Sequence, residues 1–168
     1  MKKQILTITL LLTTIVSALA FNGGNNTIKS KTLTPEQTYT SITAKGNVEV
    51  ILVSSQSTVI SLEGDEKFVE KVRVRVSKGV LHIAGVNGRS KDRVTVYVPV
   101  NDLGLVTLRN GSNLSSKGRL INRLLRVRVE GVSVVNLKSA GEIIIDSDDN
   151  HLFNYEKQEH YKVIVEKA

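Results

Sequence analysis

The chain has 168 residues, a formal net charge of +7 and 40% hydrophobic residues, which is the size and composition of one globular domain. Cysteine is absent, so disulfides, thiolate zinc sites, a cysteine nucleophile and a lipoprotein anchor are excluded. Aromatic residues make up only 4% and tryptophan is absent, so the core must be built from Val, Ile and Leu.

The first residues, 1–20, have the pattern of a secretory signal peptide. Lys2 and Lys3 precede an apolar stretch, and Ala18 and Ala20 form a small-x-small cleavage site. The apolar stretch is shorter than the ~20 residues that a membrane-spanning helix needs, which disfavours a permanent anchor. We therefore predict cleavage before Phe21, export to the periplasm or the medium, and a mature chain without a transmembrane segment.

The predicted mature chain is only moderately basic. Loss of Lys2 and Lys3 lowers the formal charge from +7 to +5, and the remaining charge is not concentrated as it is in nucleic-acid binders. Export also argues against a nucleic-acid partner. We expect no nucleic acid to bind.

Residues 21–41 are rich in Asn, Gly, Thr and Ser and are predicted to form a flexible leader. Residues 42–168 contain a series of short segments in which apolar residues recur at every second position. Clusters of Gly, Asn, Asp and Ser separate these segments. This period is typical of β-strands with one buried face. We predict a single all-β domain over 42–168.

One segment, residues 64–71, offers at most a short helix. Asp65 is its expected N-cap, and Phe68, Val69 and Val72 share one face.

Two all-β arrangements remain open, a β-helix solenoid and a β-sandwich, and an internal repeat helps to choose between them. A shift of 21 residues places Leu108 on Val129 and Leu114 on Val135, and it also matches Ser112 with Ser133 at an expected turn. About 20 residues of short strands and tight corners form one coil of a β-helix. The repeat favours a β-helix solenoid, and a β-sandwich is the alternative.

Several segments occur in a characteristic order: ITAKGNVEVIL at 42–52, LEGD at 62–65, GVLHI at 79–83 and VTVYVPV at 94–100, followed by two Gly-Ser-type repeats. Over roughly residues 42–141 this order resembles the bacterial family "putative auto-transporter adhesin, head GIN domain". The resemblance implies an exported protein with a single-stranded right-handed β-helix and an adhesin-like role, and it implies no particular ligand or catalytic residue. The chain has no room for a C-terminal translocator barrel, so a small periplasmic or secreted protein is expected.

No pattern of catalytic residues stands out, and the protein is not expected to be an enzyme. A Gly-x-Ser-x-Gly elbow is absent, and the three histidines lack the spacing of a zinc site. A carbohydrate-active enzyme, either a polysaccharide lyase or a hydrolase, is the alternative on this scaffold and needs paired carboxylates. The outward acids Glu49, Glu63 and Glu130 are expected to be scattered.

No cofactor and no tight metal site are expected. Asp146, Asp148 and Asn150 stand at alternate positions, as oxygen ligands do at the start of a calcium loop. His151 then replaces the required glycine, and Lys157 replaces the bidentate glutamate. The segment is better interpreted as a polar turn, with weak calcium binding as the alternative.

Two surface features could bind a partner. Arg73, Arg75, Arg126 and Arg128 are expected to face outward, and on neighbouring coils they would form a basic stripe for an anionic polysaccharide. The alternative is that these arginines only keep the surface soluble and protect strand edges from pairing with other chains. Val132 and Val134 are expected to face solvent and could contact another envelope protein. The sequence thus predicts an exported, non-enzymatic β-solenoid with an adhesin-like binding or structural role in the cell envelope.

Overall fold

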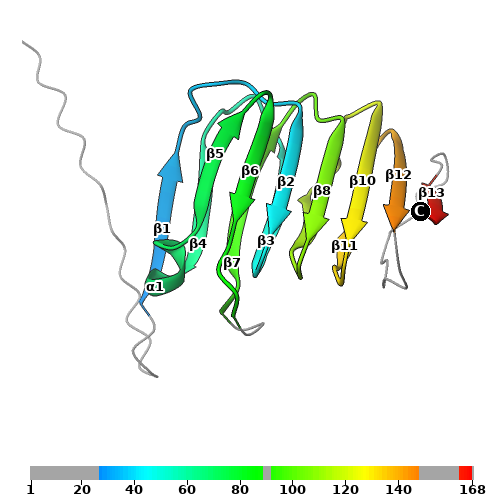
Figure 1. Ribbon diagram of the computed structural model, residues 1–168. Coiled ribbons are helices and arrows are strands. Elements are labelled where there is room, and N and C mark those ends of the chain that lie inside the picture. Colours follow the sequence, from blue (N-terminus) through cyan, green and yellow to red (C-terminus); the bar gives the residue numbers. More distant parts are fainter. Residues whose placement is uncertain (1–26, 89–91, 148–162, 168) are drawn as a thin grey trace, which may run out of the picture.

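The structure, a computed structural model, describes residues 27–88, 92–147 and 163–167, with side chains described up to Ser147. This part of the chain is all-β, with one short helix, α1 (Glu66–Val69). Its strands form two sheets, which we name sheet A and sheet B. Figure 1 shows β1 and α1 at one end of the molecule and β12 toward the other.

Both sheets are mixed. Within the described residues, sheet A has the order β1 (Ile28–Leu33), β4 (Ile60–Asp65), β7 (Val94–Val100), β3 (Val48–Ser54), β9 (Asn113–Lys117), β11 (Val135–Asn136). Sheet B has the order β13 (Val163–Lys167), β12 (Glu142–Ser147), β10 (Leu124–Glu130), β8 (Leu105–Arg109), β2 (Ser41–Lys45), β6 (Val80–Ala84), β5 (Arg73–Ser77). The pairs β1–β4, β4–β7 and β5–β6 are antiparallel, whereas the other pairs are parallel.

The predicted 21-residue register is confirmed. Strands β8 and β10 pair in parallel with Leu108 opposite Val129, and β9 and β11 pair in parallel with Leu114 opposite Val135. The chain alternates between the two sheets here, so each repeat contributes one strand to sheet B and one to sheet A. Apolar residues at this offset therefore stack in the same layer of the core.

A single-stranded right-handed β-helix is not shown for the whole domain, and the two-sheet layout is closer to the alternative, a β-sandwich. Strands β2 and β3 lie between β6–β7 and β8–β9 instead of preceding them in a stack that follows chain order. Antiparallel pairs also gather at the end of the molecule where β1 and β5 lie. In a solenoid each coil adds strands parallel to those of the previous coil, whereas the strands at this end of the molecule pair antiparallel.

The hairpin between β5 and β6 shows the local cause of this departure. Lys78 and Gly79 connect the two strands and both have positive φ, at 52° and 73°. Two consecutive residues with positive φ form a type I′ turn, whose twist brings the next strand back beside the previous one. The chain therefore reverses at a point where a coil would continue forward.

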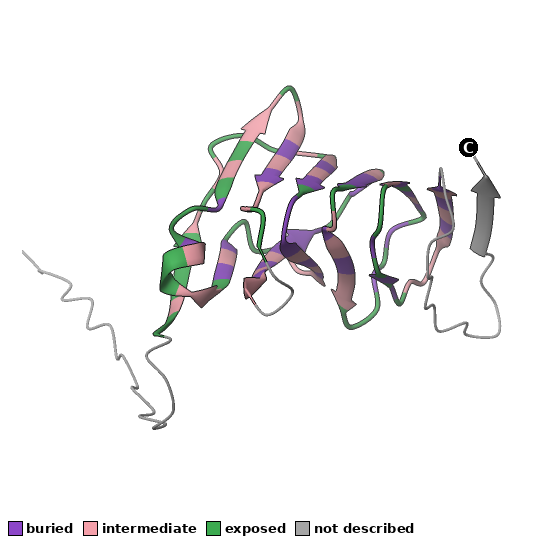
Figure 2. Ribbon diagram, turned by 60° about the horizontal axis from the view of Figure 1, so that its bottom comes forward, coloured by how far each residue is buried: buried purple, intermediate pink, exposed green. Residues whose placement is uncertain are grey.

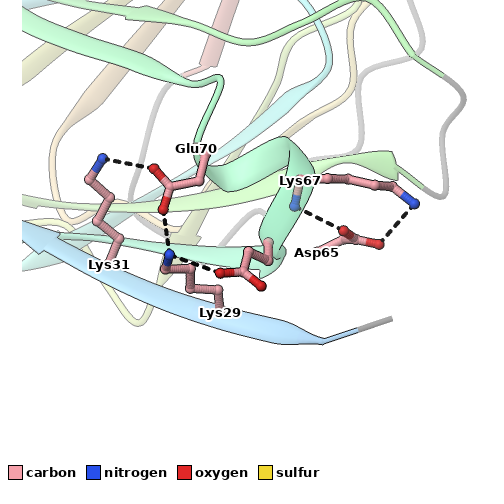
Figure 3. A network of polar contacts seen from close by, with 6 residues as sticks. Lys29, Lys31, Asp65, Lys67 and Glu70 are labelled. Carbon is pink, nitrogen blue, oxygen red and sulfur yellow. Dashed lines mark hydrogen bonds and ion pairs between the residues drawn. The ribbon is translucent and has the colours of Figure 1, made fainter. Parts of the chain in front are cut away.

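The expected flexible leader is wrong for residues 28–33, which form β1 on the edge of β4. Pairing with β4 supplies the backbone hydrogen bonds that this polar segment would otherwise make to water. Lys29 and Lys31 of β1 also contact Glu70 beside α1, while Lys67 of α1 contacts Asp65 (Figure 3). Because the pairs of Lys29 and Lys31 with Glu70 are exposed, they orient the edge strand and add little free energy.

The core lies between the sheets and is aliphatic, as the composition requires. Buried and partly exposed residues alternate along the central strands, visible as purple and pink bands in Figure 2. The largest fully buried side chains include Ile42, Leu52, Ile60, Leu62, Leu81, Ile83, Leu108, Leu114, Leu120 and Leu125.

The short helix follows its predicted pattern. The Asp65 side chain caps α1 by accepting a hydrogen bond from the backbone N–H of Lys67 at 3.1 Å. Val69 and Val72 are buried against the core, and Phe68 packs beside them. Among the described residues, no helix is long and apolar enough to cross a membrane.

Candidate binding site

The four predicted stripe residues all lie on sheet B but form two separate pairs. Arg126 and Arg128 are on β10, whereas Arg73 and Arg75 are on the edge strand β5. Strands β8, β2 and β6 separate β10 from β5, which at about 4.8 Å per strand amounts to roughly 19 Å. The predicted stripe required the two arginine pairs to lie on neighbouring strands, and they do not.

The row of residues between the two arginine pairs is uncharged or weakly basic. The strand register aligns Arg128 with Thr107, Thr107 with Thr43, Thr43 with His82, and His82 with Arg75. Thr107 is buried, and His82 is half-buried. The outer face of sheet B thus carries a polar row that runs from Arg128 on β10 to Arg75 on β5.

Arg126 already has an acidic partner within the fold. Its Nη1 atom lies 3.5 Å from Oδ2 of Asp146 on the adjacent strand β12. Asp146 is the first residue of the calcium candidate, whereas Asp148 and Asn150 lie outside the described residues. Among the described residues, no group of three or more His, Cys, Asp or Glu side chains could hold a metal ion.

Val132 and Val134 face solvent, as their positions in the sequence predict. They lie between β10 and β11, and 81% and 46% of their surfaces are exposed. Ile121 and Leu124, before and at the start of β10, are exposed as well.

A cleft on the outer face of sheet A was not foreseen from the sequence. The alternation along β7 directs Val94, Val96 and Val98 into the core, so Tyr97 is directed outward from the middle of the sheet. The cleft around Tyr97 has a volume of about 410 Å³, and we name it the Tyr97 cleft. Its lining includes Val53, Ser61, Glu63, Tyr97, Pro99 and Lys117.

Polar contacts surround the tyrosine ring. The Tyr97 hydroxyl donates a hydrogen bond to Oε2 of Glu63 at 3.1 Å, and Lys117 Nζ lies 6.0 Å from the ring centre. On the other side of β7, Ser115 Oγ donates to Oε1 of Glu49 at 3.3 Å. Strands β4, β7, β3 and β9 therefore bring hydroxyl, carboxylate and ammonium groups to one surface.

Two of the three acids expected to be scattered are brought together here. Glu63 on β4 and Glu49 on β3 are both register partners of Thr95 on β7, one from each side. Glu130 lies on sheet B instead, where both of its carboxylate oxygens contact the Arg109 guanidinium, at 2.7 and 3.0 Å. The sequence signal for the cleft is the outward aromatic residue in the alternating VTVYV segment, but only strand pairing shows which acids flank it.

The environment of Tyr97 keeps its hydroxyl protonated. Burial raises the pKa of Tyr97, and the hydrogen bond to Glu63 and the negative charges of Glu63 and Glu49 raise it further. The hydroxyl therefore remains a hydrogen-bond donor through neutral and mildly alkaline pH.

A second hollow of about 350 Å³ lies where the β1–β2 loop meets the end of β7. The Tyr39 hydroxyl spans this junction and donates a hydrogen bond to the carbonyl oxygen of Pro99 at 2.8 Å. Burial raises the pKa of Tyr39 to about 12. Because Pro99 also lines the Tyr97 cleft, this hydrogen bond holds one wall of the cleft in place.

We expect Tyr39→Phe to lower the free energy of unfolding by about 1 kcal/mol at neutral pH, the usual contribution of one hydrogen bond. The Tyr39 pKa is raised from 10.0 to about 12 in the folded state, so its contribution is complete below pH 10 and falls as pH rises toward about 12. Denaturant unfolding at a series of pH values would show the variant losing less stability than the parent across this window. Identical pH profiles for the two proteins would contradict the assignment.

Comparisons with known proteins place this fold among proteins named as adhesins. A "putative adhesin" from Parabacteroides distasonis ATCC 8503 aligns over 80% of this chain and 67% of its own chain, with a TM-score of 0.55 and 19% identity. A "putative adhesin" from Bacteroides fragilis NCTC 9343 aligns over 84% of this chain and 93% of its own, with a TM-score of 0.50 and 11% identity. At these identities the likeness concerns the fold alone. No curated protein matches the sequence.

Family membership rests on the sequence itself. Residues 38–152 match the family described as "Putative auto-transporter adhesin, head GIN domain". The match spans more than half of the 168 residues, and the chain belongs to this family.

Proposed function

We propose that this chain is an exported, non-enzymatic binding protein of the cell envelope with an adhesin-like role. The observation that carries the proposal is its membership of the head GIN family over residues 38–152. Two structural neighbours named as adhesins support it through the shared fold. The proposal includes removal of residues 1–20 as a signal peptide, because a basic start, an apolar stretch and Ala18-x-Ala20 form that pattern.

The arrangement of the strands supports a binding role. In this proposal, β8–β11 are coils of a short β-solenoid, with each repeat adding one strand to each sheet. Strands in register present side chains as straight rows on the outer faces, and such rows can contact an extended partner over several strands. The Tyr97 cleft is a hollow on one of these faces, where hydroxyl, carboxylate and ammonium groups converge.

Export is tested by expressing the full chain in a bacterial host and fractionating the cells. The expected result is a protein in the periplasm or the medium whose N-terminal residue is Phe21, measured by intact mass and N-terminal sequencing. Ala20→Arg, which blocks the cleavage site, is the matched control and should leave the precursor unprocessed. An exported protein that still begins at Met1 would contradict the processing step.

Binding is tested with the purified mature chain and intact bacterial cells or isolated envelopes. The two partner classes predicted from the sequence respond differently to salt. An anionic polysaccharide held by the arginine pairs should be released as ionic strength rises, and Arg128→Ala should weaken it. An envelope protein held by Val132 and Val134 should resist salt and be lost in Val132→Asp. Failure to retain cells or envelopes under any of these conditions would contradict the adhesin-like role.

A carbohydrate-active enzyme is the second candidate, and one observation favours it. Glu49 and Glu63 approach the same outer face from the two sides of β7. Paired carboxylates on one face are the requirement for glycoside cleavage. Release of reducing ends from a polysaccharide, abolished by both Glu49→Gln and Glu63→Gln, would establish an enzyme in place of a binding protein.

A further inference from the structure

We propose that the Tyr97 cleft binds a neutral oligosaccharide, with the Tyr97 ring as its stacking platform. The inference rests on the proposed binding function and adds the class of ligand and the place where it binds. It assigns the binding surface to sheet A, whereas the arginines predicted to bind a partner lie on sheet B.

The floor of the cleft suits the flat side of a sugar ring. A pyranose has an apolar C–H face and carries its hydroxyl groups around its edge, so it packs on an aromatic ring that has polar groups nearby. Tyr97 supplies the ring, while half-buried Val53 and exposed Val59 supply apolar surface to the lining. Val53 is the register partner of buried Pro99 on the adjacent strand, and both residues line the cleft.

Two carboxylates suit sugar hydroxyls: Glu63 in the lining of the cleft, and Glu49 outside the lining on the same outer face. A carboxylate can accept about four hydrogen bonds, and the described contacts use one at Glu63, from Tyr97, and one at Glu49, from Ser115. Both carboxylates therefore retain capacity for hydroxyl donors. They arise from strands on either side of β7, about 10 Å apart at the backbone, which is longer than one sugar ring and fits a chain of at least two.

The local charge favours a neutral ligand over an anionic one. Glu49 and Glu63 contribute two negative charges near the ring, and Lys117, 6.0 Å from the ring centre, contributes one positive charge. A sulfated or uronate-bearing chain would meet net repulsion here. The hydrogen bond from the Tyr97 hydroxyl to Glu63 restricts the orientation of the ring on the outer face of sheet A.

The test uses the mature chain on an array of neutral oligosaccharides, built from hexoses and N-acetylhexosamines, and of acidic oligosaccharides that carry uronate or sulfate. We expect retention of at least one neutral oligosaccharide, and the affinity for it should fall about tenfold or more in Tyr97→Ala. Tyr97→Phe keeps the ring and should lose less. Raising the salt concentration from about 50 mM to about 500 mM should change the affinity little, because no ligand charge is involved. Lys45→Ala, an exposed lysine on β2 of sheet B outside the arginine pairs, is the matched control and should bind as the parent does.

Each other outcome overturns the inference and is distinguishable from failure of the proposed function. Salt-sensitive binding of acidic oligosaccharides that Arg128→Ala weakens and Tyr97→Ala leaves intact would move the site to sheet B, while the binding role stands. Adhesion to cells without retention of any oligosaccharide would exclude this ligand class and leave the binding role in place. Absence of both cell adhesion and oligosaccharide binding would overturn the inference and the proposed function together. Circular dichroism of each variant confirms that loss of binding is not loss of folding.

Discussion

Gly141→Ala is expected to lower the free energy of unfolding by about 4 kcal/mol or more, or to prevent folding. A Cβ atom at this position would lie 2.1 Å from the carbonyl oxygen of Asn122 and 2.4 Å from that of Arg123. Both contacts are with backbone, so no side-chain rotation can relieve them. The Arg123 carbonyl also accepts the hydrogen bond from the N–H of Glu142 at the start of β12. Relief of the clash therefore requires β12 to move away from β10.

Gly104→Ala is the matched control for this prediction. Gly104 directly precedes β8, as Gly141 directly precedes β12, but a Cβ atom there would meet only the Thr40 carbonyl oxygen, at 3.9 Å. That distance is an ordinary contact, so we expect a change within about 0.5 kcal/mol. Denaturant unfolding followed by circular dichroism measures both variants. Equal midpoints for the two variants would show that β12 is not seated against β10 as described.

Val129→Asp is expected to lower the free energy of unfolding by about 3–5 kcal/mol, because it places an unpaired carboxylate in the aliphatic core. Val129 is only 1% exposed and lies in β10, with Leu108 of β8 and Ser147 of β12 as its register partners. No cation among these neighbours can compensate the new charge. Thermal and denaturant unfolding of the purified variant measure the loss.

Arg128→Asp changes the adjacent residue on the opposite face and serves as the control. Arg128 is exposed, so no desolvation cost arises. Its register partner on β12 is Asp146, and a second carboxylate beside it should cost up to about 1 kcal/mol by like-charge repulsion. A cost for Arg128→Asp equal to that of Val129→Asp would contradict the assignment of the two faces of β10.

The candidate site was only partly accessible to sequence reasoning. The outward direction of Tyr97 follows from the alternation along residues 94–98, and the exposure of Val132 and Val134 was predicted. The approach of Glu63 and Glu49 to Thr95 depends on pairing between strands 32 and 46 residues apart in the chain. No local pattern carries that information, because one strand can pair with several others of similar hydrophobic character.

The sequence by itself determined the features that depend on the spacing of residues along the chain. Alternation of apolar and polar residues established the all-β class and the aliphatic core, since successive side chains on a strand face opposite sides. The helix cap at Asp65 and the register of Leu108 with Val129 follow from short-range patterns and from the 21-residue repeat.

The tertiary structure alone decided how the repeats and the remaining strands assemble. It placed β1 on the edge of β4, inserted β2 and β3 between later strands, and separated Arg73 and Arg75 from Arg126 and Arg128. The physical reason is that the sheet edge chosen by each strand depends on which backbone hydrogen bonds other strands have left unpaired. The pairing partner of a strand is therefore a property of the assembled sheets. It determines which side chains lie beside each outward residue, but the sequence of the strand itself does not reveal it.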